Sequence, residues 1–169
     1  MPDRTPDRFF DTVTLSNFVL SGAFGLLLDR YGPFLRVTEQ VRAELAAGRA
    51  RGYPELEAVE RALATGSIVP TEPMTTPESE LFVDLLHALG SGEASCIALA
   101  RLRDGIVATD DRTARSYCAD WNIPVTGSIG ILKALCIDNA VSSKEADAIL
   151  ERMVVAGFYS PVRRISDLL

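Results

Sequence analysis

The segment Ile106-Val-Ala-Thr-Asp-Asp111 is a short apolar run that ends in two aspartates, which is typical of a buried strand leading into a polar turn. A helix that opens at Glu93 is predicted to precede it and to end at Gly105. Residues 112–121 are predicted to form the helix that follows. A strand between two helices indicates a parallel sheet, with helices on its faces and right-handed crossovers.

The same alternation of strand and helix recurs along most of the chain. Apolar runs predict strands over residues 8–11, 34–37, 67–70, 106–109 and 123–125. Helical spacing of apolar residues predicts helices between them, among them a buried helix over 13–28 and one capped by Thr38. The chain is therefore predicted to be an α/β protein with a central parallel sheet of four to five strands.

The C-terminal part of the chain shows no further strands. Ser142 and Glu145 have the spacing of a capping box, apolar residues share one face of the helix that follows, and Gly157 is its predicted end. This part is expected to be a packed helical extension over about residues 131–169. With 169 residues and no internal repeat, one domain over 1–169 is expected, with its core at about 8–130.

Composition excludes several classes of protein and site. The three cysteines are widely spaced and form no C-x-x-C pair, which indicates a reducing cytoplasm, and the single histidine lies in an apolar run. A zinc site of the Cys/His type is therefore not expected. Polar residues interrupt the apolar stretch over 13–28, so neither a membrane span nor a secretory signal is predicted. A net charge of −6 argues against non-specific binding of a polyanion by charge alone.

Acidic residues fall at positions that can converge on one crevice. Asp11 and Asp110 each follow a predicted strand, and in an open parallel sheet ligands bind beyond the carboxyl ends of the strands. Glu44 lies on the flank of a buried helical stripe, and Glu93 lies in the first turn of a helix after a glycine-containing loop. Carboxylates without histidine or cysteine suit Mg²⁺ or Mn²⁺, which can promote phosphodiester cleavage.

Each of these residues also has a purely structural interpretation. Asp11 and Asp111 are both placed to cap a helix, and Glu93 can complement a helix macrodipole. Glu44 alone would usually be a solvated helix residue. The metal-site hypothesis rests on the joint placement of the acidic residues.

Three other classes of protein that place their functional site at strand ends fit the sequence less well. A phospho-accepting hydrolase would need a second Asp where Val13 stands, and a receiver domain would need a lysine where Thr126 and Gly127 stand. Dinucleotide binding would need a G-x-G-x-x-G motif after the first strand, where no glycine occurs. None of these three classes is expected.

Five segments together resemble the PIN-domain family, including the VapC-like toxin nucleases and related uncharacterised PIN proteins. They are Phe10-Asp-Thr-Val-Thr-Leu-Ser-Asn17, Val41-Arg-Ala-Glu-Leu45, Gly92-Glu-Ala-Ser95, Ala108-Thr-Asp-Asp-Arg-Thr-Ala-Arg115 and Ile123-Pro-Val-Thr-Gly127. The resemblance covers about residues 8–130 in order and spacing. It implies a three-layer α/β/α fold around the parallel sheet, and the tail is similar to an extension found in one subgroup of the family.

The resemblance also implies an activity and a set of site residues. The implied function is a Mg²⁺- or Mn²⁺-dependent endoribonuclease in which Asp11, Glu44, Glu93 and Asp110 are catalytic, with Glu44 helping to hold a water on the metal. The metal would be bound by residues at Asp11, Glu93 and Asp110, and Asp111 adds a further carboxylate beside them. Glu93 stands where many relatives carry aspartate.

Partners follow from the same resemblance. RNA is the implied substrate, and Arg112 and Arg115 are candidates for binding its phosphates, with an ion pair to the carboxylates as the alternative for each. A toxin of this family would have a small antitoxin that covers the crevice, and a homodimer is a further expectation. The alternative function is a catalytically weak or inactive PIN-like scaffold that binds a protein partner.

Overall fold

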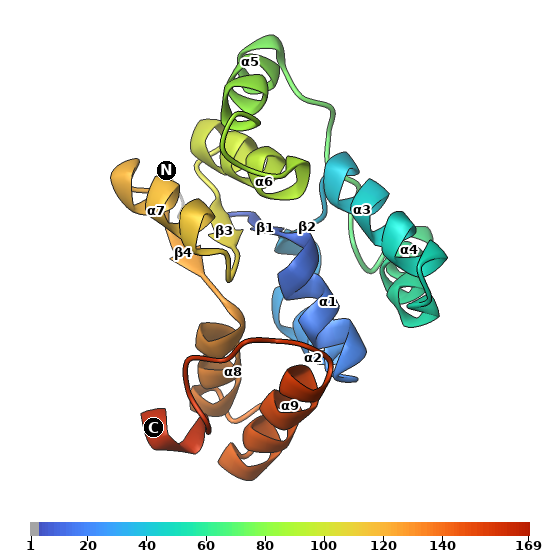
Figure 1. Cartoon of the computed structure of the whole chain (residues 1–169), viewed down its shortest axis with the longest axis vertical. Helices are drawn as coiled ribbons and strands as arrows, with labels where there is room; N and C mark the ends of the chain where they lie inside the picture. The colour runs from blue at the N-terminus through green and yellow to red at the C-terminus, as the bar shows by residue number, and fades with distance from the viewer. Residues whose placement is uncertain (1–3) are drawn as a thin grey trace.

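The computed structural model describes residues 4–169 and shows four short strands in one parallel sheet within that range (Figure 1). The strands are β1 (Arg8–Phe10), β2 (Leu35–Arg36), β3 (Ile106–Ala108) and β4 (Val125–Thr126). Their order is β2-β1-β3-β4, and Phe10 of β1 pairs with Ala108 of β3. The predicted α/β architecture with a parallel sheet of at least four strands is confirmed.

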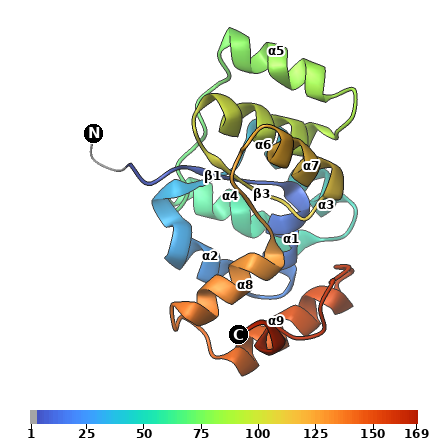
Figure 2. The same ribbon diagram turned by 90° about the vertical axis from the view of Figure 1, so that its left-hand side faces the viewer.

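Helices cover both faces of this sheet. They are α1 (Thr12–Leu20), α2 (Phe24–Tyr31), α3 (Glu39–Ala50), α4 (Glu57–Ala64), α5 (Thr76–Leu85), α6 (Ser91–Leu102), α7 (Arg112–Asp120), α8 (Ser128–Ile137) and α9 (Ser143–Val155). Short 3-10 turns add η1 (Gly32–Phe34), η2 (Pro54–Leu56) and η3 (Ser166–Leu168). Figure 2 shows α5 and α6 on one side of the strands and α2, α8 and α9 on the other, which is a three-layer arrangement.

The core lies where α6 crosses the two central strands. Phe9 and Phe10 of β1 are fully buried, and every residue of α6 from Ala94 to Ala100 is buried. Strands of a parallel sheet are covered on both faces and therefore read as continuous apolar runs rather than as alternating ones. This burial holds the carboxyl ends of β1 and β3 rigidly side by side.

The single helix predicted over 13–28 is wrong, because the chain breaks there into α1 and α2. Gly22 has a φ of +76°, a left-handed conformation that glycine adopts at little cost and that ends the helix. The amide of Ala23 bonds to the carbonyl of Phe18, which closes the turn. The apolar spacing continues across this break, and it therefore concealed the turn.

The strand predicted over 67–70 is also wrong. Ile68 is fully buried, but its amide donates to the carbonyl of Ala62 at the end of α4 and does not pair with another strand. The last strand is Val125–Thr126 and not 123–125, because the amide of Ile123 bonds to the carbonyl of Cys118 and closes α7. Short apolar runs do not distinguish a strand from a buried anchor in a loop.

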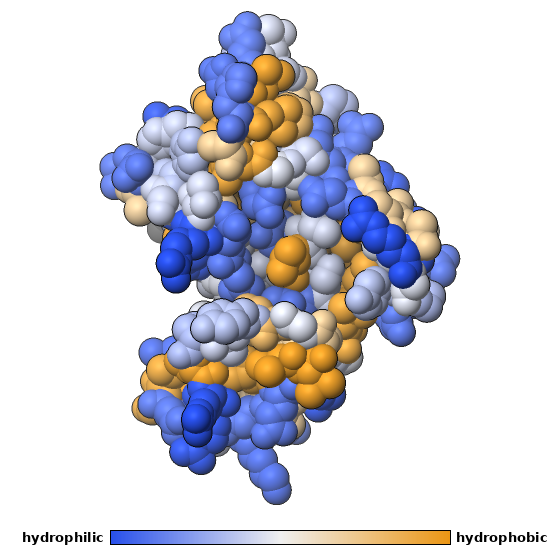
Figure 3. Space-filling model, in the orientation of Figure 1, coloured by the Kyte–Doolittle hydropathy of each residue, from blue (hydrophilic) through white to orange (hydrophobic). Residues whose placement is uncertain are grey.

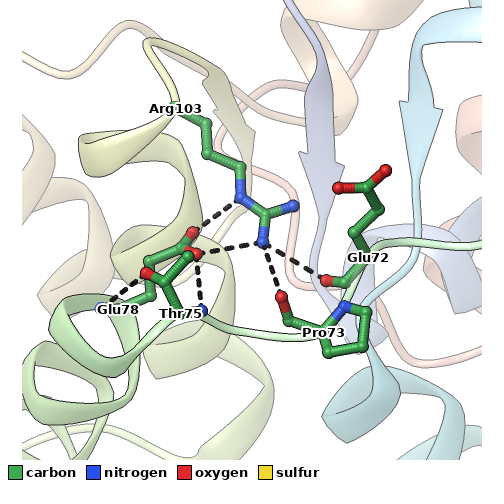
Figure 4. Close-up of polar contacts among 5 residues, drawn as sticks. All are labelled: Glu72, Pro73, Thr75, Glu78 and Arg103. Carbon is green, nitrogen blue, oxygen red and sulfur yellow. Dashed lines mark hydrogen bonds and ion pairs between the residues drawn. The ribbon is translucent and has the colours of Figure 1, made fainter.

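A cluster of polar contacts around Arg103 lies before β3, at the end of the sheet opposite the aspartates (Figure 4). Arg103 donates from Nε to Glu78 at 2.6 Å and from Nη2 to the carbonyls of Glu72 and Pro73 at 3.2 and 3.3 Å. Glu78 is 2% exposed and completes a capping box with Thr75 at the start of α5. The pKa of Glu78 is lowered, first by its hydrogen bonds from Arg103. This cluster ties α5 and the loop before it to the end of α6.

The C-terminal extension packs against α1. The predicted capping box of Ser142 and Glu145 is confirmed at the start of α9, and Gly157 follows the helix with a φ of +115°. Arg152 donates from Nε to the carbonyl of Ser21 at 2.7 Å, so α9 is bonded to the turn that ends α1.

Within residues 4–169, none of the helices is by itself both long and apolar enough to cross a bilayer. The segments Thr12–Leu20 and Phe24–Phe34 meet the length and composition criteria only as a pair, bent by 118°.

Candidate metal centre at the switch point of the sheet

Asp11 lies where β1 passes into α1, and it is 1% exposed. Its Oδ1 accepts from the amide of Thr14 at 2.8 Å, which makes it the N-cap of α1. Its Oδ2 accepts from the hydroxyl of Thr109 at 2.5 Å, across the sheet from the end of β3. Asp11 is therefore a helix cap that also faces the neighbouring strand.

Asp110 follows β3 and is half-buried among polar groups from two helices. It accepts from the amide and the hydroxyl of Ser128 at 2.8 and 2.5 Å, and from the amide group of Asn17 at 3.3 Å. The hydroxyl of Thr14 also reaches Asp110 at 3.4 Å. Thr14 thus contacts Asp11 through its amide and Asp110 through its hydroxyl, so the two aspartates share one crevice as the order of the strands requires.

Asp111 is the N-cap of α7, and its side chain accepts from the amide of Ala114 at 2.8 Å. The residue is exposed, and its own amide donates to the hydroxyl of Thr109 at 3.1 Å. The structural interpretation of Asp111 as a cap is correct. Its carboxylate lies at the open rim of the crevice, whereas Asp11 lies at the buried end.

Glu44 and Glu93 approach the crevice from α3 and α6. Glu44 accepts from the hydroxyl of Ser91 at 3.3 Å, at the start of α6. Gly92 makes this approach possible, because a methyl group at that position would overlap the carboxylate of Glu44 and would lie 3.1 Å from Oγ1 of Thr12. Glu93 occupies the first turn of α6, as predicted, and is half-buried.

The electrostatics show that these side chains act on one another. The pKa of Asp11 is raised to about 7, chiefly by burial and to a lesser degree by the charge of Glu93, against the lowering effect of its hydrogen bonds. Burial also raises the pKa of Glu93, and the charges of Glu44 and Asp111 add to that effect. Close like charges and desolvation both disfavour ionised carboxylates, so a cation placed here would relieve them.

The residues present fit a hydrated hard cation better than a fully protein-coordinated one. Among the residues from 4 to 169, no three Asp, Glu, His or Cys side chains are close enough together to enclose one ion. Mg²⁺ retains several waters and uses one or two carboxylates, so it does not need such a cage. Oγ1 of Thr12 is buried beside Glu44 and has no hydrogen-bond partner within the described part of the chain, as expected at a place built for a further polar ligand.

The two arginines predicted to bind substrate differ in their surroundings. Arg115 is exposed and donates from Nη1 to the carbonyl of Thr109 at 2.9 Å, so it braces the end of β3. Arg112 is exposed in the first turn of α7. In the described range, 4–169, neither arginine forms an ion pair with the carboxylates. Figure 3 shows the surface hollowed between α7, where hydrophilic residues gather, and the C-terminal helices, where hydrophobic residues gather.

Several polar residues of the crevice were not predicted from the sequence. They are Thr12, Thr14, Asn17, Thr109 and Ser128. One signal was available for two of them, since Thr14 and Asn17 lie three residues apart and hence on one face of a helix whose other buried residues are apolar. A buried polar stripe of this kind needs partners, and here it finds Asp110.

Comparison with known proteins agrees with this geometry. A family model described as a PIN domain matches residues 8–169, so the match includes the C-terminal extension as well as the sheet. No curated protein matches the chain. PIN domains are generally nucleases, and the fold found here is of that nuclease type. The chain belongs to the PIN-domain family.

Proposed function

We propose that this protein is a Mg²⁺- or Mn²⁺-dependent endoribonuclease that hydrolyses phosphodiester bonds at the crevice between β1 and β3. The single observation that carries the proposal is the shared contact of Asp11 and Asp110 with Thr14 at the switch point of the sheet. Ligands of open parallel sheets bind at that point, and a family of nucleases supplies the class of reaction.

In this proposal the carboxylates divide into two groups. Asp11, Glu93, Asp110 and Asp111 hold the cation, directly or through its waters, and Glu44 with Thr12 orients a water beside it. Lewis acidity towards a phosphoryl oxygen and towards a water is the chemistry that the bound cation would supply. Hydrolysis of RNA also needs a binding surface for phosphates, for which the exposed Arg112 and Arg115 are proposed.

A second candidate function is a PIN-like scaffold with weak catalysis or none. The observation in its favour is that Asp11 and Asp111 each cap a helix and Asp110 accepts hydrogen bonds from Ser128 and Asn17. Such aspartates contribute to folding whether or not a metal binds. A scaffold of this kind would bind a protein partner over the crevice.

Family membership supports further proposals on partners and place. PIN nucleases act on nucleic acid and often pair with antitoxins. We therefore include in the proposal an RNA substrate, a small antitoxin that covers the crevice, a homodimer, a cytoplasmic location and one domain over residues 1–169. Purification from the native host tests the antitoxin, which should co-purify as a small protein, and size-exclusion chromatography with light scattering tests the dimer.

Thermal unfolding in EDTA and in millimolar Mn²⁺ tests the metal site without a guessed substrate. A cation that binds only the folded state raises the midpoint by mass action. In Asp11→Asn the side-chain oxygen can still cap α1, so we expect the variant to fold and to lose the Mn²⁺-dependent rise. Asp84→Asn is the matched control, because Asp84 is an exposed carboxylate on α5, and it should keep the full rise.

The same three proteins are then incubated with single-stranded RNA and Mn²⁺. We expect the wild type and Asp84→Asn to cut the RNA, and Asp11→Asn to be at least 100-fold slower, the order of loss seen when one essential stabilising group is removed. If the wild type neither responds to Mn²⁺ nor cuts RNA, the nuclease proposal fails and the scaffold function takes its place.

A further inference from the structure

A hollow of about 290 Å³ lies between α1 and α3 and begins at the proposed metal centre. Thr12 and Glu44 line one end of it, and both also belong to the crevice. Arg51 and Tyr53 line the other end, beyond the last turn of α3. We call this hollow the α1–α3 slot. The slot therefore adjoins the two residues that are proposed to orient a water at the metal centre.

The walls of the α1–α3 slot are mainly apolar, and the apolar residues come from four parts of the chain. Leu20 of α1, Ala47 of α3, Leu56 of η2 and Ala156, at the end of α9, line it. The C-terminal extension therefore supplies part of the wall. Ligand sites in proteins are hollows of roughly 300–1,000 Å³ with mainly apolar walls and a few polar groups. The α1–α3 slot is at the lower limit of this range, which suits one flat ring system rather than an extended ligand.

Gly48 sets the position of the far end of the slot. A methyl group at residue 48 would come within 2.8 Å of Cδ1 of the buried Leu56, so Leu56 of η2 would have to shift away from α3 to admit it. The carbonyl of Gly48 also accepts from the amide of Tyr53 at 3.2 Å. Tyr53, which precedes η2, is therefore fixed over the last turn of α3 and not left on a free loop.

Tyr53 and Arg51 are both available to a ligand. Tyr53 is 49% exposed and, among residues 4–169, its ring stacks on no other aromatic ring. Arg51 is exposed and forms no ion pair within the same range. An unpaired cation and an exposed aromatic side chain at the same end of an apolar slot indicate a ligand that is flat and also anionic.

We propose that the α1–α3 slot holds one unpaired nucleobase of a single-stranded RNA, stacked on Tyr53, with Arg51 on the adjoining phosphate. Proteins read single-stranded RNA by stacking splayed bases on aromatic rings and on guanidinium groups, whereas bases of a duplex are not free to enter such a site. The proposal rests on the proposed function and deepens it, since it places the substrate beside Glu44 and selects unpaired strands.

Binding of a fluorescent single-stranded RNA tests the base contact. The measurement uses Asp11→Asn protein in Mg²⁺, in which cleavage is expected to be slow enough to leave the RNA intact, and follows fluorescence anisotropy. Base stacking on an aromatic ring contributes about 1–3 kcal/mol, so adding Tyr53→Ala should weaken binding by roughly 5- to 150-fold. Tyr53→Phe keeps the ring and should bind as the parent does. Tyr159→Ala removes a tyrosine that is 93% exposed and does not line the slot, and it should have no effect.

The salt dependence of the same binding tests the phosphate contact. One phosphate contact on a single strand changes the slope of log K against log salt by about 0.7. Arg51→Gln should reduce the slope by that amount. Lys144→Gln removes an exposed cation at the start of α9 and should leave the slope unchanged.

The outcomes separate this proposal from the nuclease proposal. If Mn²⁺ stabilises the wild type but Tyr53→Ala binds RNA as tightly as its parent, the slot is not a base site and the nuclease proposal stands. If Tyr53→Ala weakens binding while Mn²⁺ has no effect on stability, the slot stands and the metal site fails. Failure to bind single-stranded RNA, or equal affinity for the annealed duplex, overturns the slot proposal. If the slot holds a protein segment and not RNA, Tyr53→Ala will leave the affinity for single-stranded RNA unchanged.

Discussion

The hydroxyl of Thr109 donates to Oδ2 of Asp11 at 2.5 Å, joining two residues that are 98 positions apart in the chain. The same hydroxyl accepts from the amide of Asp111 at 3.1 Å. One threonine thus connects the buried aspartate to the exposed one across the ends of β1 and β3. The first prediction follows from the loss of this group.

Thr109→Val should destabilise the protein by about 1–3 kcal/mol at pH 8, because it leaves a buried carboxylate oxygen and a backbone amide without partners. It should also raise the pKa of Asp11 further, since the hydrogen bond from Thr109 is the largest influence that lowers this pKa. Urea unfolding of the two proteins measures the free energy. Thr109→Ser keeps the hydroxyl and should recover most of the loss, and a Ser variant as unstable as Val would contradict the assignment.

The metal-free protein should lose stability as the pH rises from about 5 to 8. The pKa of Asp11 is raised from 3.8 to about 7 by burial, so the fold favours the protonated form. The stabilising contribution is complete below pH 4 and is lost as the pH rises through 7. Each pKa unit corresponds to about 1.4 kcal/mol, so the change is on the order of a few kcal/mol. Urea unfolding in EDTA across this range measures it, and Asp11→Asn should flatten the profile. An equally steep profile in the variant would assign the effect elsewhere.

Gly92→Ala should weaken the response to Mn²⁺ while leaving the fold intact, because it displaces Glu44, which is proposed to hold a water beside the cation. A methyl group there overlaps the carboxylate of Glu44, which is the end of a flexible side chain and can turn away. The helix itself gains from alanine by roughly 0.5–1 kcal/mol, which offsets part of the disturbance. Thermal unfolding with and without Mn²⁺ measures both effects. Gly25→Ala on α2 has open space and should respond to Mn²⁺ as the wild type does, and an unchanged response in Gly92→Ala would place Glu44 outside the site.

Arg103→Leu should destabilise the protein on the order of 3 kcal/mol, because Glu78 is 2% exposed and would be left as an unpaired buried charge. The lowered pKa of Glu78 gives the sign of the pH dependence: its stabilising contribution is present at neutral pH and is lost as the pH falls below about 4.5. Chemical unfolding at pH 7 and pH 4 should therefore show a smaller difference between variant and wild type at pH 4.

The matched control for this prediction is Arg42→Leu, which breaks the more exposed pair of Arg42 and Glu60. Such surface pairs contribute about 0–1 kcal/mol, so the loss should be small. Both variants should keep their response to Mn²⁺, since neither arginine lies at the carboxyl ends of β1 and β3. Equal losses in the two variants would show that burial of Glu78 is not what matters.

Local patterns sufficed to predict the strands that carry the aspartates. The apolar run Phe9-Phe10 predicts a buried strand, and both residues are buried. The residue that follows this strand then lies at the carboxyl edge of the sheet. The pairing of β1 with β3 was a condition of the predicted crevice and was not itself predicted from any residue; the structure shows it. The break at Gly22 was missed because apolar spacing continues through it.

The polar interior of the crevice could not be predicted in the same way. Asn17 reaches Asp110 across 93 positions and Ser128 across 111, and no periodicity in the sequence encodes such a contact. Ile68 shows the related difficulty for apolar residues, because a core anchor and a strand residue look alike in a short run. What was missed depends on the tertiary arrangement, which brings distant segments together.

Helix α1 is held at both of its ends by residues from distant parts of the chain. Thr109 bonds to Asp11 at its start, and Arg152 bonds to the carbonyl of Ser21 at its end. The helix thus connects the carboxyl edge of the sheet to the C-terminal extension. A change in the position of α9 that breaks the hydrogen bond from Arg152 would therefore remove one of the two side-chain contacts that hold α1, the helix whose N-cap is Asp11.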